Sequence, residues 1–126
     1  MLYNRDPTEA YRRVDFDARV KGADSRQLVD LCLEQVAGSL SRAIHAAGTG
    51  DNGSKSRALT RAVSALTALE MGVDPNAPTG TALIQLYQSA RTTILDNVLT
   101  FNPTQLAQIR ADFIEIRQAM MGAPPP

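Results

Sequence analysis

Apolar residues recur at helical spacing in four long segments of this chain, and this periodicity constrains the fold more than any other feature. A spacing of three or four residues places the side chains on one face of an α-helix, which must be buried against a neighbour. The segments cover about residues 25–47, 55–72, 83–99 and 103–120. Because short connections between long helices place them antiparallel, the sequence predicts an all-α, antiparallel four-helix bundle with an N-terminal arm or short extra helix.

Two of the predicted helices have clear start signals. Asp24 is a good N-cap, and Gln27 stands where a capping box requires Glu or Gln. Asn102 is the N-cap of the last segment, followed by Pro103 at N1 and Gln105 at N3. These signals predict helix starts at residues 25 and 103.

The segment LIQLYQSARTTILDNVL, residues 83–99, carries more apolar residues than a surface helix needs. Its apolar positions fill an arc of roughly 220°, whereas a stripe of about 100° is typical of a surface helix. The predicted core seam comprises Leu83, Tyr87, Ala90, Ile94 and Val98, with Leu86 on one flank and Ile84, Leu95 and Leu99 on the other. This surplus of apolar surface predicts a partner, which is either another protein or a second copy of this chain.

The chain has 126 residues, enough for one domain with one core. We expect an N-terminal arm over residues 1–23, a helical bundle over residues 24–121 and a flexible Pro-rich tail over residues 122–126. The apolar spacing within the arm fits a helix and a strand equally, so its structure stays open.

Charge and hydropathy narrow the choice of partner and location. The 13 basic and 13 acidic side chains cancel, which argues against a nucleic-acid partner. No apolar run reaches the length of a membrane span, and no signal-peptide core precedes the first helix, so we expect a cytoplasmic protein without direct membrane insertion.

Residues suited to chemistry are few and scattered. Cys32 lies in an apolar helical run, so we expect a small buried hydrophobic side chain. Asp30 and Glu34 lie four residues apart on one helical face, and we expect a solvated pair of carboxylates. We therefore expect no enzyme, no cofactor and no metal site. His45, on the polar side of the first helix, leaves one alternative open, because histidine phosphotransfer domains are four-helix bundles with one exposed histidine.

The order of several motifs resembles the flagellin-specific export chaperones of the bacterial flagellar secretion system. The stretch AYRRVDFDARVKGADSRQLVDLCLE (residues 10–34) is similar to the N-terminal signature of that family. SRALTRAVSALTAL is similar to its second long helix, ALIQLYQSARTTIL to its Leu-x-x-Leu-Tyr helix, and IRQAM to its closing Arg-x-Ala-Trp segment. This chain departs from the pattern in Cys32-Leu33-Glu34, in NAPTG before the third helix, and in Met120, which replaces the Trp.

The resemblance implies an antiparallel bundle that binds the C-terminal amphipathic segment of flagellin in an apolar groove. Such a chaperone prevents premature polymerisation and delivers flagellin to the membrane component of the export gate. The expected groove residues are Leu31, Leu33, Leu86, Tyr87, Ala90, Ile94 and Leu95. The resemblance also implies that Tyr11 and Val14 in the arm cover the groove of the free protein, which we expect to be a monomer or a weak homodimer.

Overall fold

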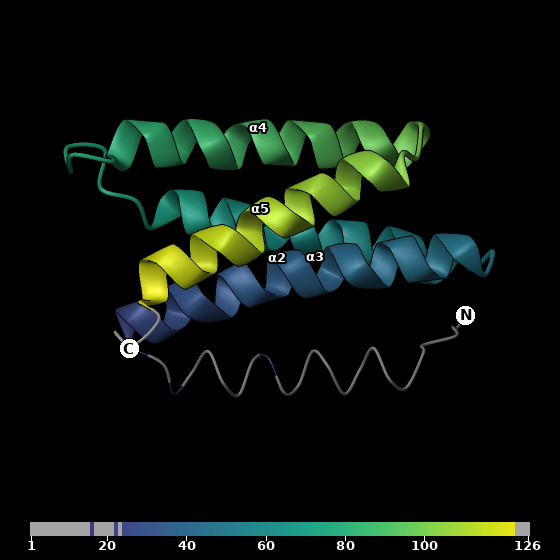
Figure 1. The fold of residues 1–126 in the computed structure, drawn as a ribbon, viewed down its shortest axis with the longest axis horizontal. Coiled ribbons are helices and arrows are strands. Elements are labelled where there is room, and N and C mark those ends of the chain that lie inside the picture. Colours follow the sequence, from purple (N-terminus) through teal and green to yellow (C-terminus); the bar gives the residue numbers. More distant parts are fainter. Residues whose placement is uncertain (1–15, 17–21, 23, 123–126) are drawn as a thin grey trace, which may run out of the picture.

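The fold is built from long antiparallel helices, as the periodicity predicts. The structure is a computed structural model, and it describes residues 16, 22 and 24–122. Four helices make up most of this part: α2 (Ser25–Gly48), α3 (Asn52–Met71), α4 (Gly80–Leu99) and α5 (Pro103–Met121) (Figure 1). No strand occurs among the described residues, and the predicted all-α bundle is confirmed.

Both predicted capping signals are confirmed. The Asp24 carboxylate accepts a hydrogen bond from the backbone N–H of Gln27 at 2.8 Å, and the Gln27 side chain accepts one in return from the backbone of Asp24 at 3.0 Å. At α5, the Asn102 side chain accepts from the backbone N–H of Gln105 at 3.1 Å, and Pro103 occupies the first turn. Each cap satisfies a backbone donor that the helix itself cannot pair.

The two middle helices begin earlier than predicted. The expected loop before α3 shrinks because Asp51 caps the helix, accepting hydrogen bonds from the backbone and the hydroxyl of Ser54 at 3.0 and 2.8 Å. α4 begins at Gly80 rather than near Leu83. At this position a Cβ atom would lie 2.1 Å from the carbonyl oxygen of Asp74, so the close approach of the preceding turn requires glycine.

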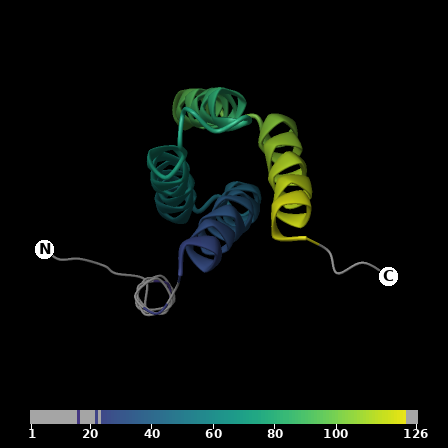
Figure 2. The ribbon, with the colours of Figure 1, turned by 90° about the vertical axis from the view of Figure 1, so that its left-hand side faces the viewer.

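The helices surround one core. α2 packs against both α3 and α5, and α4 packs against α3. Figure 2, viewed roughly along the helices, shows α2 between α3 and α5, with α4 on the far side. The rings of Tyr87 on α4 and Phe113 on α5 lie 6.2 Å apart between their centroids, inside this arrangement. Among the described residues the largest fully buried apolar side chains are Tyr87, Phe113, Leu33, Leu40, Leu59, Leu66, Ile94, Leu106 and Val36.

Most of the wide apolar arc of α4 is covered by the bundle itself. Tyr87, Ala90 and Ile94 are buried, as the predicted seam requires. The prediction for Val98 is wrong, because this side chain is 52% exposed. The interior position of the last helical turn is taken instead by Asn97, which is 1% exposed.

Asn97 holds the corner between α4 and α5. Its Oδ1 accepts a hydrogen bond from the backbone N–H of Asn102 at 2.6 Å. Its Nδ2 donates to the carbonyl oxygen of Thr93 and to the Gln105 side chain, both at 2.9 Å. A buried amide with all of these partners is well satisfied, which explains how a polar residue occupies a core position.

Candidate functional site

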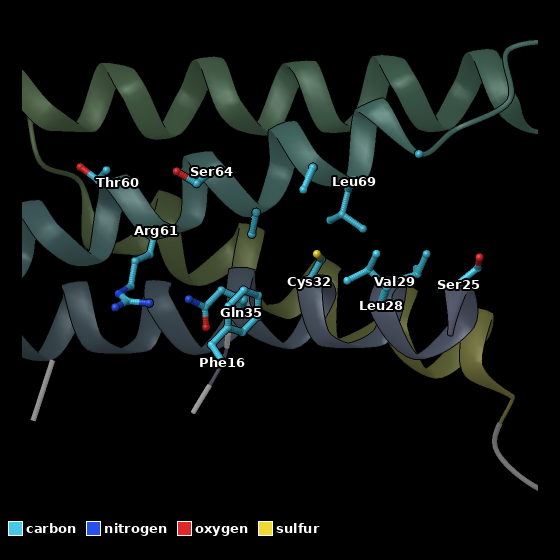
Figure 3. A pocket seen from close by; sticks show the side chains of 13 residues that line it. Phe16, Ser25, Leu28, Val29, Cys32, Gln35, Thr60, Arg61, Ser64 and Leu69 are labelled. Carbon is cyan, nitrogen blue, oxygen red and sulfur yellow. The ribbon is translucent and has the colours of Figure 1, made fainter. Parts of the chain in front are cut away.

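An apolar groove lies between α2 and α3. Its volume is about 610 Å³, within the range of pockets that hold small ligands or several side chains. The N-terminal half of α2 forms one wall and the C-terminal half of α3 forms the other (Figure 3). The lining residues are Phe16, Ser25, Leu28, Val29, Cys32, Gln35, Thr60, Arg61, Ser64, Ala65, Ala68, Leu69 and Gly72.

Small residues on α3 create the groove. Ala65 and Ala68 of α3 line the groove together with Leu28 and Cys32 of α2, and larger side chains at the two alanine positions would fill part of its space. Cys32 and Leu69 are buried in its floor, whereas Leu28 is 38% exposed on its rim. The groove therefore offers apolar surface that a partner side chain can reach and cover.

The two ends of the groove differ in polarity. Leu28, Val29 and Leu69 form an apolar end, and Figure 3 shows Arg61 and Gln35 together at the other end. Arg61 is the one charged side chain among the described residues that line the groove. An occupant of this groove therefore meets a hydrophobic surface at one end and a guanidinium at the other.

The N-terminal arm contributes Phe16 to this groove. Phe16 is partly buried, and Figure 3 shows its ring beside Gln35. The predicted covering residues, Tyr11 and Val14, lie outside the described part of the chain. Phe16 is the described residue that links the arm to the groove, and sequence analysis did not select it.

Most of the predicted groove residues belong to the core of the free chain. Five of the seven are buried in this conformation: Leu31, Leu33, Tyr87, Ala90 and Ile94. Of these, Leu33, Tyr87, Ala90 and Ile94 pack in the main core cluster. Leu86 is partly buried and packs against the core, and Leu95 is 50% exposed. None of the seven lines the groove between α2 and α3, so their contact with flagellin stays a prediction.

The predicted carboxylate pair has a basic partner on another helix. Arg117 on α5 contacts Asp30 at 2.6 Å and Glu34 at 3.1 Å, beside a second hollow between α2 and α5. The hydrogen bond to Asp30 is the main cause that raises the pKa of Arg117. These side chains are 31–42% exposed, so the interaction aligns α5 with α2 while adding little stability.

The residues that could support other chemistry lie apart. His45 is exposed in the last turn of α2, and Cys32 is buried in the groove floor, where desolvation raises the pKa of the thiol. Within the described ranges, no three or more His, Cys, Asp or Glu residues cluster as metal ligands. In that same part of the chain, no helix has the length and hydropathy needed to cross a membrane.

Comparison with known proteins identifies the family. The model of the family described as flagellar protein FliS matches residues 7–124, nearly the whole chain. No match was found among the curated proteins. The match spans the segments that carry the sequence resemblance and all four helices of the described bundle. The chain therefore belongs to the FliS family, the flagellin-specific export chaperones of the bacterial flagellum.

Proposed function

We propose that this protein binds the C-terminal amphipathic segment of flagellin in the cytoplasm, prevents its premature polymerisation and delivers it to the membrane component of the flagellar export gate. Family membership supports the chaperone role. The observation that supports the proposed location of the binding site is the open apolar groove between α2 and α3. An amphipathic helix binds in such a groove by burying its apolar face.

Side chains of flagellin enter the groove between Leu28 of α2 and Ala68 of α3. Both residues are exposed at its mouth, while Cys32 and Leu69 supply a buried apolar floor. Phe16 occupies part of the same space, so a ligand side chain must displace it or pack beside it. If Phe16 must be displaced, the free energy with which the arm docks in the groove is subtracted from the free energy of flagellin binding, and the apparent affinity for flagellin falls.

A substitution that fills the groove tests its use. Ala68→Trp places a large ring at the groove mouth from an exposed helix position, so the core is not overpacked. We expect at least about a tenfold loss of affinity for a peptide of the flagellin C-terminal segment, measured by fluorescence anisotropy with the full chain. Ala111→Trp, at an exposed position on α5, is the matched control and should bind normally. Wild-type affinity of a folded Ala68→Trp variant would show that flagellin binds elsewhere.

The apolar residues of α4 are a second contact region for the bound segment. Leu95 is half exposed and Leu86 partly buried, so Leu95→Asp is the less disruptive test. We expect Leu95→Asp to weaken peptide binding with an unchanged unfolding midpoint. Unchanged peptide affinity of Leu95→Asp would show that flagellin contacts α2 and α3 but not this part of α4. If Leu95→Asp instead increases the fraction of monomer, the exposed end of α4 is the interface of a weak homodimer.

The phosphotransfer alternative makes a different prediction for the single histidine. His45 is exposed, as a phosphoryl acceptor must be. If the protein acts as a chaperone, His45→Ala should leave flagellin binding unchanged. Transfer of phosphate from a phosphorylated response regulator to the wild type, but not to His45→Ala, would favour the alternative.

A further inference from the structure

We propose that the bound flagellin segment crosses the outer face of α3 as a helix and contacts apolar surface on both sides of α3. One apolar side chain of the segment enters the groove between α2 and α3. A second one, about seven residues away in the segment, packs on Leu95 and Val98 of α4. This inference rests on the proposed function and specifies the course of the segment and the spacing of its apolar residues.

Leu95 and Val98 lie on the side of α4 that borders α3. Arg91 of α4 pairs with Glu70 of α3 at 2.6 Å and donates a hydrogen bond to the hydroxyl of Thr67 at 3.3 Å. Leu95 and Val98 follow Arg91 by four and seven residues, and residues at these spacings share one face of a helix. Because each of the two side chains is half exposed, they form an apolar surface along the outer seam between α3 and α4.

The outer face of α3, between this apolar surface and the groove, is formed by uncharged side chains. Thr60, Ser64 and Thr67 are exposed and recur at helical spacing. Arg61 is the one charged residue within residues 58–69, and it lines the groove toward α2. The exposed face of a surface helix usually carries charged side chains. A partner that covers this face of α3 therefore displaces water from hydroxyl and methyl groups and not from ions, which costs less free energy.

The two threonine hydroxyls are already paired within α3. Thr60 donates to the carbonyl oxygen of Ser56 at 3.0 Å, and Thr67 donates to that of Val63 at 3.1 Å. A ligand that covers the threonines therefore leaves neither hydroxyl donor without a partner. Thr60 and Thr67 are separated by about 10 Å along the helix axis, which is about the diameter of one α-helix. A helix that crosses α3 over Ser64 contacts both threonines.

The positions of the two apolar surfaces set the spacing of the ligand side chains. The groove lies on the α2 side of α3 and the surface of Leu95 and Val98 on its α4 side, so their separation is close to the distance between packed helices, about 8–10 Å. A ligand helix rises about 1.5 Å per residue, so side chains about six or seven positions apart span this distance. Of these two spacings, only seven keeps both side chains on one face of the ligand helix.

The exposed end of α4 suits an anchored segment better than a second copy of this chain. Its exposed large apolar side chains are Leu95, Val98 and Leu99. Three side chains fall far short of the roughly 800 Å² that each partner buries in a specific interface between proteins. A segment that is already held in the neighbouring groove needs less contact area, because the tether gives its second contact a high effective concentration.

An obstruction between the two apolar surfaces tests the inference. The probe is a synthetic peptide of the C-terminal segment of the flagellin from the same genome, with binding to the full chain measured by fluorescence anisotropy. Thr67→Lys places a long side chain on the proposed course from an exposed position and raises the helix propensity. We expect at least about a fivefold loss of affinity, and a loss in the same direction for the uncharged Thr67→Gln. Ser89→Lys is the matched control and should bind normally, because Ser89 is exposed two residues before Arg91 and so on the other side of α4.

An alanine scan of the peptide tests the spacing. Each peptide variant is measured against the wild type, Ala68→Trp and Leu95→Ala. One apolar peptide residue should lose its effect on affinity in Ala68→Trp, and another in Leu95→Ala, with about seven positions between the two. Coupling of the same peptide residue to both substitutions, or of two residues more than about ten positions apart, would overturn the inference.

The variants distinguish failure of this inference from failure of the proposed function. If Ala68→Trp weakens binding but Thr67→Lys binds like Ser89→Lys, the groove holds flagellin without a crossing of α3, and the inference fails. Unchanged binding by Ala68→Trp would reject the groove and both proposals. If Thr67→Lys lowers self-association of the protein in analytical ultracentrifugation and keeps the peptide affinity of the wild type, this face belongs to a second copy of the chain and the inference is wrong.

Discussion

Replacing Asn97 with alanine should destabilise the bundle by removing the polar connection at the corner between α4 and α5. The Asn97 side chain is 1% exposed and makes three hydrogen bonds. The most important is the 2.6 Å hydrogen bond from the backbone N–H of Asn102 to Asn97 Oδ1. Asn102 is the N-cap of α5, so its part-buried N–H makes no hydrogen bond within the helix. Alanine leaves the donor in place without its acceptor.

The magnitude follows from these contacts. Each hydrogen bond contributes about 1 kcal/mol, so three lost bonds correspond to about 3 kcal/mol. Alanine has a higher helix propensity than asparagine, which offsets roughly 0.6 kcal/mol of this loss. We therefore expect Asn97→Ala to lower the free energy of unfolding by about 2 kcal/mol. Asn102→Ala should cost about 1 kcal/mol, because it removes the cap of α5 and keeps the backbone bond to Asn97.

Urea unfolding followed by far-UV circular dichroism measures both effects. At an m-value of about 2 kcal/mol/M, the Asn97→Ala midpoint should fall by about 1 M with an unchanged m-value. Asn76→Ala, in the exposed turn before α4, is the control and should stay within about 0.5 kcal/mol of the wild type. A loss for Asn97→Ala no larger than that of the control would show that apolar packing alone holds the corner.

Two further predictions concern the ends of the middle helices. Gly80→Ala should lower the free energy of unfolding in urea, because the new Cβ atom would clash with the carbonyl oxygen of Asp74. Gly48→Ala is the control and should be neutral or stabilising, because the space around its Cβ position is open. Equal effects of the two substitutions would refute the close contact between Gly80 and the Asp74 carbonyl. Hydrogen bonds from the Ser54 backbone and hydroxyl lower the pKa of Asp51 in the folded state. The stabilisation by Asp51 is therefore present above its ordinary pKa and lost as the pH falls through the lowered value, so the stability difference between the wild type and Asp51→Ala should shrink in acid. A difference that grows in acid would show that this linkage has the opposite sign.

The sequence alone determined the class of the fold and the helix ends whose signals are local. Helical periodicity specifies four amphipathic segments, and each confirmed cap joins residues only three positions apart: Asp24 with Gln27, and Asn102 with Gln105. The same local reasoning placed the start of the second helix near residue 55, whereas the Asp51 cap starts this helix at Asn52. A cap contributes enough to override weak helix propensity over one turn.

The candidate groove was decided by the tertiary structure. Leu28 and Ala68 follow ordinary helical spacing, and nothing local distinguishes a groove wall from a core seam. The groove exists because α2 and α3 are neighbours that set small residues against a partly exposed leucine. For the same reason the wide apolar arc of α4 did not locate a binding surface, since the surrounding bundle covers most of it and leaves Leu95, Val98 and Leu99 exposed. Periodicity counts the apolar side chains of a helix, but only the arrangement of its neighbours decides which of them are buried.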